Sequence, residues 1–192
     1  MASKARVIPI VAIVVIIVLI GVFWYVGQRN AIVRLDEDIE AAWGEIDNQL
    51  QRRSDLIPNL VATVRGFADQ EQEVFGQIAD ARARLAGAQT VGETAEGYQQ
   101  LEGALSRLLV ITENYPELRS SENFQALMDE LAGTENRIAV ARRRYNESVQ
   151  EFNRKIRTFP TNMAANAMGM SPREYFEVSD EDREVPVVDF GS

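Results

Sequence analysis

The side chains available for chemistry in this 192-residue chain are carboxylates, hydroxyls and a few amines, since the sequence contains neither cysteine nor histidine. Without cysteine there is no thiolate nucleophile, no disulfide and no cysteine-based zinc site. Without histidine there is no Ser-His-Asp relay and no histidine-ligated metal. The composition therefore favours a protein that is not an enzyme and that carries no cofactor.

Paired carboxylates remain as a route to catalysis. Glu113, Glu135 and Tyr145 could line the cleft of a carboxylate-based hydrolase, which is the least favoured of three functional hypotheses. A carboxylate-bridged di-iron site in a helical bundle would require Glu-x-x-His pairs, which a chain without histidine does not contain. We therefore assign no catalytic, metal-binding or cofactor-binding residue.

Arg53 is a charged residue at an apolar position of a predicted helix. A buried arginine requires an acidic partner, and Glu113 and Glu135 on other predicted helices are the candidates. The candidate residues of a structural polar layer are Arg53, Asp55, Glu113, Glu135 and Arg137. Because a polar residue in an apolar seam can specify helix register, we expect this layer to serve structure rather than catalysis.

Basic side chains concentrate between residues 137 and 157, where only Glu147 and Glu151 oppose them. The candidates for a surface that binds lipid headgroups or an acidic partner are Arg142, Arg143, Arg144, Arg154, Lys155 and Arg157. The alternative is that these cations pair with acidic helices of the same bundle. No nucleic-acid partner is expected, because a chain with a net charge of −9 repels the phosphate backbone.

Residues 7–27 form an apolar run without a charged side chain. A helix of this length covers roughly 30 Å, the thickness of the hydrocarbon core of a bilayer. Phe23, Trp24 and Tyr25 end the run, where membrane-interface aromatic residues belong. The alternative, a cleaved signal peptide, would have a shorter apolar region followed by small residues. The run therefore predicts an uncleaved single-pass membrane anchor.

The orientation of this anchor depends on the basic residues that flank it. Lys4 and Arg6 precede the run, and Arg29 and Arg34 follow it, so the basic count is tied. The free amino terminus slightly favours an orientation with that end in the cytoplasm. The rest of the chain would then lie outside the cytoplasm.

Helical periodicity continues after the anchor. Apolar residues at alternating steps of three and four from Ile39 to Ala81 predict one helix, which Pro58 either kinks or interrupts. Glycines and small polar residues predict a loop from Leu85 to Glu96. The same spacing predicts a second helix that begins near Tyr98 and ends before Pro116.

The last long helix has the most regular pattern. Ser120 or Ser121 is expected to begin it, and apolar residues recur every seven positions from Phe124 to Phe159. We expect an amphiphilic piece over residues 162–170 and a short helical turn from Ser171 or Pro172 to Glu177. The brief stretch Val185–Phe190 is the one candidate strand.

These patterns predict an all-α protein, with an N-terminal transmembrane helix running into a long antiparallel three- or four-helix bundle. The expected organisation is a short N-terminal tail (1–6), a transmembrane anchor (7–27), a helical bundle (28–177) and an acidic C-terminal tail (178–192).

Three stretches of the chain closely resemble the LemA family. They are Ala42–Val61, with Trp43, Arg52-Arg53 and Pro58; Ala104–Pro116; and Thr134–Asn146, which Ile156-Arg-Thr-Phe159-Pro160 follows. The similarity covers about Leu35 to Glu177. The residues that match the family pattern are Arg52, Arg53, Asp55, Glu113, Asn114, Glu135, Asn136 and Arg137.

The resemblance implies a protein of the bacterial plasma membrane with an N-terminal anchor and a long helical bundle. The family is similar to a magnetosome protein that is linked to membrane invagination. It has no accepted enzymatic activity and no established catalytic residues. The resemblance therefore implies no catalytic set for this chain.

The favoured hypothesis is a membrane-anchored helical scaffold that self-associates and organises or remodels the bacterial membrane. Its partners would be the membrane and further copies of the chain. The second hypothesis is a membrane-tethered adaptor that docks an envelope protein or protease through the acidic tail, by strand addition. The third is the hydrolase.

Overall fold

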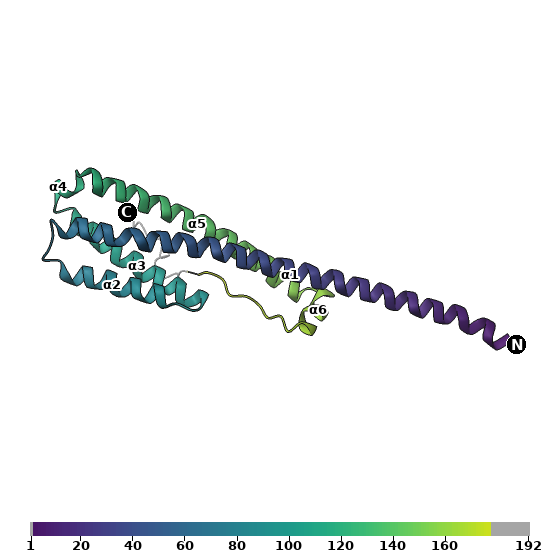
Figure 1. Cartoon of the computed structure of the whole chain (residues 1–192). Coiled ribbons are helices and arrows are strands. Elements are labelled where there is room, and N and C mark those ends of the chain that lie inside the picture. Colours follow the sequence, from purple (N-terminus) through teal and green to yellow (C-terminus); the bar gives the residue numbers. More distant parts are fainter. Residues whose placement is uncertain (1, 178–192) are drawn as a thin grey trace, which may run out of the picture. The chain divides into compact units, whose positions relative to one another are not determined.

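The computed structural model describes residues 2–177, and all regular secondary structure in this range is helical (Figure 1). The helices in chain order are α1 (Ala2–Arg65), α2 (Gln72–Gly87), α3 (Val91–Thr112), α4 (Pro116–Arg119), α5 (Glu122–Arg157) and α6 (Thr161–Ala167). The predicted all-α fold, with a long apolar N-terminal helix followed by further helices, is confirmed. The candidate strand Val185–Phe190 and the acidic tail lie outside the described residues.

Helix α1 continues without interruption through Pro58. Of the two alternatives at this proline, a kink or an interruption, the interruption is wrong: Ile57 and Leu60 on either side are fully buried and hold the helix in place, while Pro58 itself is exposed. The helix ends at Arg65 instead. The prediction of one helix from Ile39 to Ala81 is therefore also wrong.

A six-residue turn, 66–71, separates α1 from α2. The backbone N–H groups of Phe67 and Ala68 both donate to the carbonyl oxygen of Val64, at 2.9 and 3.0 Å, which closes the end of α1. Ala68 is fully buried, whereas Phe67 is 43% exposed. The apolar spacing through this region thus continued across the turn that follows Arg65.

The predicted loop Leu85–Glu96 is wrong, since only residues 88–90 connect α2 to α3. Thr90 begins α3 with a reciprocal cap: its Oγ1 accepts from the Glu93 N–H at 3.1 Å, and the Glu93 carboxylate accepts from the Thr90 N–H at 3.2 Å. This capping box satisfies two backbone N–H groups and allows the helix to start early. The spacing Thr90-x-x-Glu93 was the available sequence signal.

The described residues form two compact units. Residues 43–146 and 174–177 make up the bundle unit, and residues 2–42 and 147–173 make up the anchor unit. In the bundle unit, the last part of α1, α2, α3 and the first part of α5 follow one another with short connections that reverse the chain (Figure 1). Their shared apolar core includes Ile57, Leu60, Ile78, Leu101, Leu108 and Leu131.

Burial in the anchor unit involves α1, α5 and α6. Its buried apolar residues are Ile32, Ile39, Val149, Phe152, Ile156, Ala164 and Ala165. Asn153 on α5 holds the backbone of Arg173 by two bonds, donating to its carbonyl at 2.9 Å and accepting from its N–H at 2.8 Å. This side chain positions the residues that follow α6.

The beginning and end of α5 differ in how well the sequence anticipated them. Ser121 lies before the first turn, and its Oγ accepts from the Phe124 N–H at 3.3 Å. At the other end the helix stops at Arg157, so Phe159 lies beyond it and is 76% exposed rather than part of a seam. The predicted helical turn from Ser171 or Pro172 to Glu177 is also wrong, because residues 171–177 are not helical.

Gly97 on α3 offers a test of the close packing between α2 and α3. A Cβ atom at this position would lie 3.0 Å from the Leu85 Cα and 3.1 Å from the Leu85 nitrogen, which are backbone atoms that cannot rotate away. We expect Gly97→Ala to lower the free energy of unfolding by about 1–3 kcal/mol. Urea unfolding of the full-length protein in detergent, followed by circular dichroism, measures this change.

Gly103, on the same helix, is the matched control. A Cβ at Gly103 would have no atom within 4 Å. Gly103→Ala should therefore raise the free energy of unfolding by up to about 1 kcal/mol through helix propensity. Equal changes in the two variants would contradict the close approach of α2 and α3 at Gly97.

Candidate functional site

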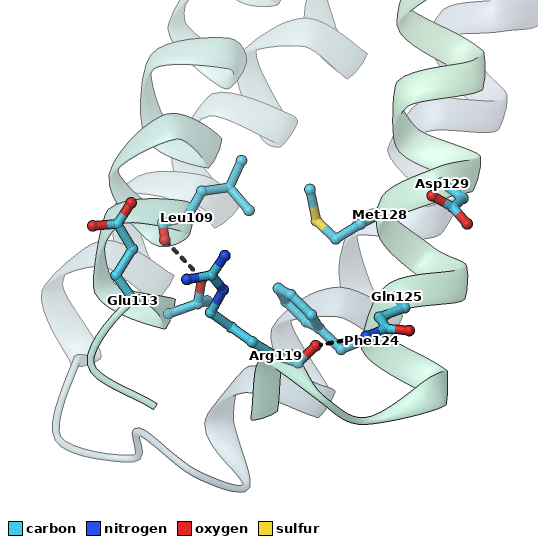
Figure 2. A pocket seen from close by; sticks show the side chains of 8 residues that line it. Leu109, Glu113, Arg119, Phe124, Gln125, Met128 and Asp129 are labelled. Atoms are coloured by element: carbon cyan, nitrogen blue, oxygen red, sulfur yellow. Dashed lines mark hydrogen bonds between the residues drawn. The ribbon is translucent and has the colours of Figure 1, made fainter. Parts of the chain in front are cut away.

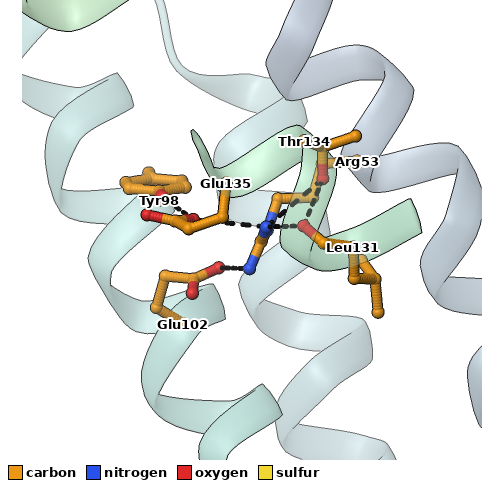
Figure 3. Close-up of polar contacts among 6 residues, drawn as sticks. All are labelled: Arg53, Tyr98, Glu102, Leu131, Thr134 and Glu135. Atoms are coloured by element: carbon orange, nitrogen blue, oxygen red, sulfur yellow. Dashed lines mark hydrogen bonds and ion pairs between the residues drawn. The ribbon is translucent and has the colours of Figure 1, made fainter. Parts of the chain in front are cut away.

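Arg53 lies inside the bundle unit and is only 5% exposed. It projects from α1 toward α3 and α5, where the side chains of Tyr98, Glu102, Thr134 and Glu135 surround it (Figure 3). We call these five residues the polar layer. Because Leu50 and Ile57, before and after Arg53 on α1, are buried, helical periodicity carries the guanidinium into the core as well.

Every partner of the Arg53 guanidinium comes from another helix. Nη2 pairs with the Glu102 carboxylate on α3 at 2.6 Å, and Nη1 pairs with the Glu135 carboxylate on α5 at 3.2 Å. Nη1 also donates to the Leu131 carbonyl at 3.0 Å and to the Thr134 Oγ1 at 3.3 Å. The buried charge is therefore paired from two sides, and it links three helices.

Burial raises the pKa of Glu102, although the neighbouring Arg53 charge opposes this shift. Glu135 adds to the rise because it is a second negative charge nearby. Burial likewise raises the pKa of Tyr98, whose hydroxyl donates a hydrogen bond to Glu135. Tyr98 is thus held as a neutral donor, and the layer contains one cation against two carboxylates.

Of the residues expected in this layer, only Arg53 and Glu135 come together. Asp55 and Glu113 are exposed and lie away from the guanidinium. Arg137 is exposed and pairs with Glu130 at 3.7 Å, a carboxylate that also binds Arg52.

The partners that sequence reasoning missed are Tyr98, Glu102 and Thr134. Tyr98 and Glu102 are four residues apart on α3 and therefore share a face of that helix. A glutamate one turn after a core tyrosine was the signal that could have identified Glu102.

The basic stretch of α5 divides between the two units. In the bundle unit, Arg144 pairs with Glu45 of α1 at 3.1 Å, as expected if these cations pair within the bundle. Arg142 and Arg143 form no ion pair with any described residue. Arg154, Lys155 and Arg157 belong to the anchor unit and stand in the last turn of α5, also without an ion pair among the described residues.

Among the described residues, α1 is the one helix with the length and composition to cross a membrane. Its apolar side chains from Val11 to Ile20 are exposed, and none of its most apolar stretch is buried. At the end of this stretch Phe23 is 76% and Tyr25 is 37% exposed, and Trp24 is half-buried.

A surface pocket of about 500 Å³ opens at the end of the bundle unit (Figure 2). Glu113 on the α3 side and Asp129 on the α5 side face its rim, and Phe124 and Met128 project between them. Neither Glu135 nor Tyr145 lines it. The three residues proposed for a hydrolase are thus not gathered: Glu135 is in the polar layer, and Tyr145 donates to the Glu174 carbonyl at 3.0 Å.

Residues 174–177 lie against the bundle unit through Phe176, which is 1% exposed. The Phe176 ring packs beside Trp43 and Tyr98. Its centroid is 6.2 Å from the Trp43 ring centroid and 6.4 Å from that of Tyr98. The Asn146 amide donates to the Phe176 carbonyl at 3.1 Å and accepts from its N–H at 2.8 Å. The half-buried Asn146 side chain therefore satisfies the backbone N–H and carbonyl of Phe176, in a segment that has no regular secondary structure.

The fold and the polar layer define a membrane-associated helical protein, with an apolar N-terminal helix and a bundle that encloses a paired arginine. The chain belongs to the LemA family, whose sequence pattern matches residues 42–190.

Named relatives share most of the chain. Magnetosome protein MamQ 2 of Paramagnetospirillum magneticum is 27% identical over 176 residues, covering 78% of this chain and 65% of the relative. MamQ of Magnetospirillum gryphiswaldense is 27% identical and covers 78% and 64%. Protein LemA of Metamycoplasma hominis is 28% identical and covers 87% and 78%. The match thus spans slightly less than two thirds of the MamQ proteins.

Removing the Arg53 charge should destabilise the bundle, because Glu102 and Glu135 would lose their shared cation. We expect Arg53→Met to lower the free energy of unfolding by about 3–5 kcal/mol at neutral pH. Urea unfolding can be followed through Trp43 in a Trp24→Phe background, since the chain has only 2 tryptophans.

Arg52→Met is the matched control for Arg53. The Arg52 side chain is 56% exposed and its ion pair with Glu130 is on the surface, so its loss should cost less than about 1 kcal/mol. Arg53→Met combined with Glu102→Gln and Glu135→Gln should recover part of the lost stability, because no unpaired charge remains. Similar losses in the two single variants would contradict a structural role for the polar layer.

Glu102 should also change how the free energy of unfolding depends on pH. Its pKa in the folded protein lies above the ordinary value of 4.5, so the folded state binds more protons than the unfolded chain between 4.5 and the folded pKa. The free energy of unfolding of the wild type, relative to Glu102→Gln, should therefore fall as the pH rises through this window.

Urea unfolding from about pH 4 to about pH 8 measures this difference. Glu96→Gln, an exposed position on the same helix, controls for the loss of one carboxylate from α3. A constant difference between the wild type and Glu102→Gln across this range would contradict the raised pKa.

Proposed function

We propose that this protein is a single-pass scaffold of the bacterial plasma membrane, which self-associates and organises or remodels the bilayer. The observation that carries the proposal is the composition of α1 along its length. Its residues from Val11 to Ile20 are exposed and apolar, and its residues from Ile46 to Val64 enter the core of the bundle unit. One helix thus supplies both the exposed apolar stretch and part of the bundle core, with no loop between these two parts.

A non-enzymatic role is supported by how the charged groups are used. The two terminal nitrogens of Arg53 pair with Glu102, Glu135 and a backbone carbonyl, an arrangement that holds helices in register. Glu113 and Asp129, at the rim of the surface pocket, are both exposed rather than held in an apolar cleft. The role we propose therefore needs no catalytic residue and no cofactor.

The relatives support the same direction. Proteins named for the magnetosome are 27% identical to most of this chain. By analogy, we propose that this chain also belongs to an organised bacterial membrane system. The orientation that we propose places the bundle unit outside the cytoplasm, with Lys4 and Arg6 on the cytoplasmic side of the span.

Self-association would use charge complementarity between copies. Arg142 and Arg143 have no ion-pair partner among the described residues, while the chain as a whole carries a net charge of −9. The two cations of one copy can thus meet an acidic surface of the next. Surface ion pairs are individually weak, so many copies on one membrane would be needed for a stable assembly.

The full-length protein reconstituted in nanodiscs and liposomes tests this proposal. Mass photometry should find oligomers, and electron microscopy should find liposomes that the protein has reshaped. Arg142→Gln/Arg143→Gln should reduce both effects, and Arg84→Gln/Arg107→Gln, which removes the same charge from α2 and α3, should not. Monomeric particles on unchanged liposomes would contradict the scaffold.

A further inference from the structure

The corner between α5 and α6, residues 158–160, brings a distant part of the chain to the end of the apolar stretch of α1. Thr161, the first residue of α6, donates a hydrogen bond through Oγ1 to the Gln28 Oε1 at 2.9 Å. Gln28 directly follows Gly27, the last residue of the charge-free run. Both residues belong to the anchor unit, so the contact lies within one compact body.

The position of Gln28 sets the depth of α6 if α1 spans a bilayer, as the proposed function holds. Gln28 lies about 1.5 Å beyond the end of the charge-free run along the helix axis. Each headgroup layer is about 5–8 Å thick. Neighbouring helices are about 8–10 Å apart and α1 would tilt by about 20°, which moves α6 by only about 3 Å in depth. The corner therefore lies within the headgroup layer whether α1 is upright or tilted.

Two apolar side chains, one in this corner and one in the first turn of α6, are open to solvent. Phe159 is 76% exposed and Met163 is 62% exposed. Among the described residues after Val26, Val110 is the one other large apolar side chain exposed to this degree, at 64%. An aromatic ring and a flexible thioether suit the boundary between headgroups and acyl chains.

Two segments next to the corner carry charge of one sign. Segments 28–35 and 152–173 contain no aspartate or glutamate. Their basic residues are Arg29, Arg34, Arg154, Lys155, Arg157 and Arg173. Arg173 pairs with Asp36 at 2.8 Å, while the other five form no ion pair with a described residue. Such a basic cluster beside exposed apolar groups matches an anionic bilayer surface, which offers phosphates above an apolar interior.

We infer that the α5–α6 corner is a membrane-contacting collar for anionic phospholipid. Phe159 and Met163 enter the interface, and Arg154, Lys155 and Arg157 bind lipid phosphates. The inference rests on the proposed membrane anchor and extends it, because the collar gives the anchor unit a second attachment to the bilayer. It also separates this end of the basic stretch from Arg144, which is paired inside the bundle unit.

A single fluorescent label reports the depth of the corner, since the chain has no native cysteine. Met163→Cys and the matched control Val110→Cys, of nearly equal exposure, are labelled with an environment-sensitive dye in the full-length protein. The protein is reconstituted in phosphatidylcholine vesicles with or without about one quarter phosphatidylglycerol, together with lipids that carry a shallow quencher. The label at 163 should be quenched at least about three-fold more than that at 110, and most strongly with phosphatidylglycerol.

The cations are tested in the same assay. Arg154→Gln/Lys155→Gln/Arg157→Gln should remove the additional quenching that phosphatidylglycerol causes at position 163. The control Arg84→Gln/Arg107→Gln/Arg119→Gln, with the same charge change in the bundle unit, should leave that quenching unchanged. Circular dichroism establishes that both variants are folded.

Three results would overturn the collar. Equal quenching at 163 and 110, in vesicles with which the protein co-floats, would reject the collar and leave the anchor in place. A label at 163 that is shielded only as protein concentration rises, without lipid quenching, would show that a second copy covers the corner. Failure of the folded protein to co-float with vesicles would reject the anchor, and with it both proposals.

Discussion

The burial of one guanidinium is the constraint on which the bundle unit depends. Arg53 is taken out of water on α1, and an ionised group in that position must be paired. Glu102 supplies a carboxylate from α3, and α5 supplies both Glu135 and the Leu131 carbonyl. Such a network adds little net stability, because removing the ions from water costs nearly as much as their attraction returns.

The value of the polar layer lies in register. A shift of one residue along a helix moves a side chain by about 1.5 Å and turns it by about 100°. Such a shift of α3 or α5 would take Glu102 or Glu135 away from Arg53 and leave a buried charge unpaired. An apolar core tolerates such a shift far better, because its contacts are not directional. The same layer orients Tyr98, whose ring then packs beside Phe176.

Helix α1 is shaped by two different requirements along its length. From Val11 to Ile20, large apolar side chains are exposed, as is typical of a helix that crosses a bilayer. In its later part, apolar residues form a stripe that enters the bundle core, and Arg53 interrupts that stripe. The change from an all-round apolar surface to a stripe occurs within one unbroken helix. Since every backbone group in a helix is bonded internally, no loop is needed at this change.

The helical class, the apolar N-terminal helix and the beginning of α5 at Ser121 could all be predicted from the sequence. Each depends on signals within a few residues: hydrophobic periodicity, the lack of charge over residues 7–27, and a serine that caps a helix. Two of the errors have a common cause. The spacing of apolar residues continued through the turn at Gly66 and past the end of α5 to Phe159, because periodicity does not show whether a residue has a neighbour to pack against.

By itself, the sequence determined the helical class and the charge-free N-terminal run, and only the tertiary structure decided which segments meet. The charge-free run and the heptad spacing specify helices because neighbouring residues act through the same backbone. The partners of Arg53 are 49 and 82 positions further along the sequence, at Glu102 and Glu135, and the residue bonded to Gln28 is 133 positions away. Such pairs depend on where the chain reverses and on how each helix is rotated. A shift of a helix by about 1–2 Å along its axis, or a rotation by tens of degrees, would break these contacts. Local helix propensity does not specify such shifts and rotations.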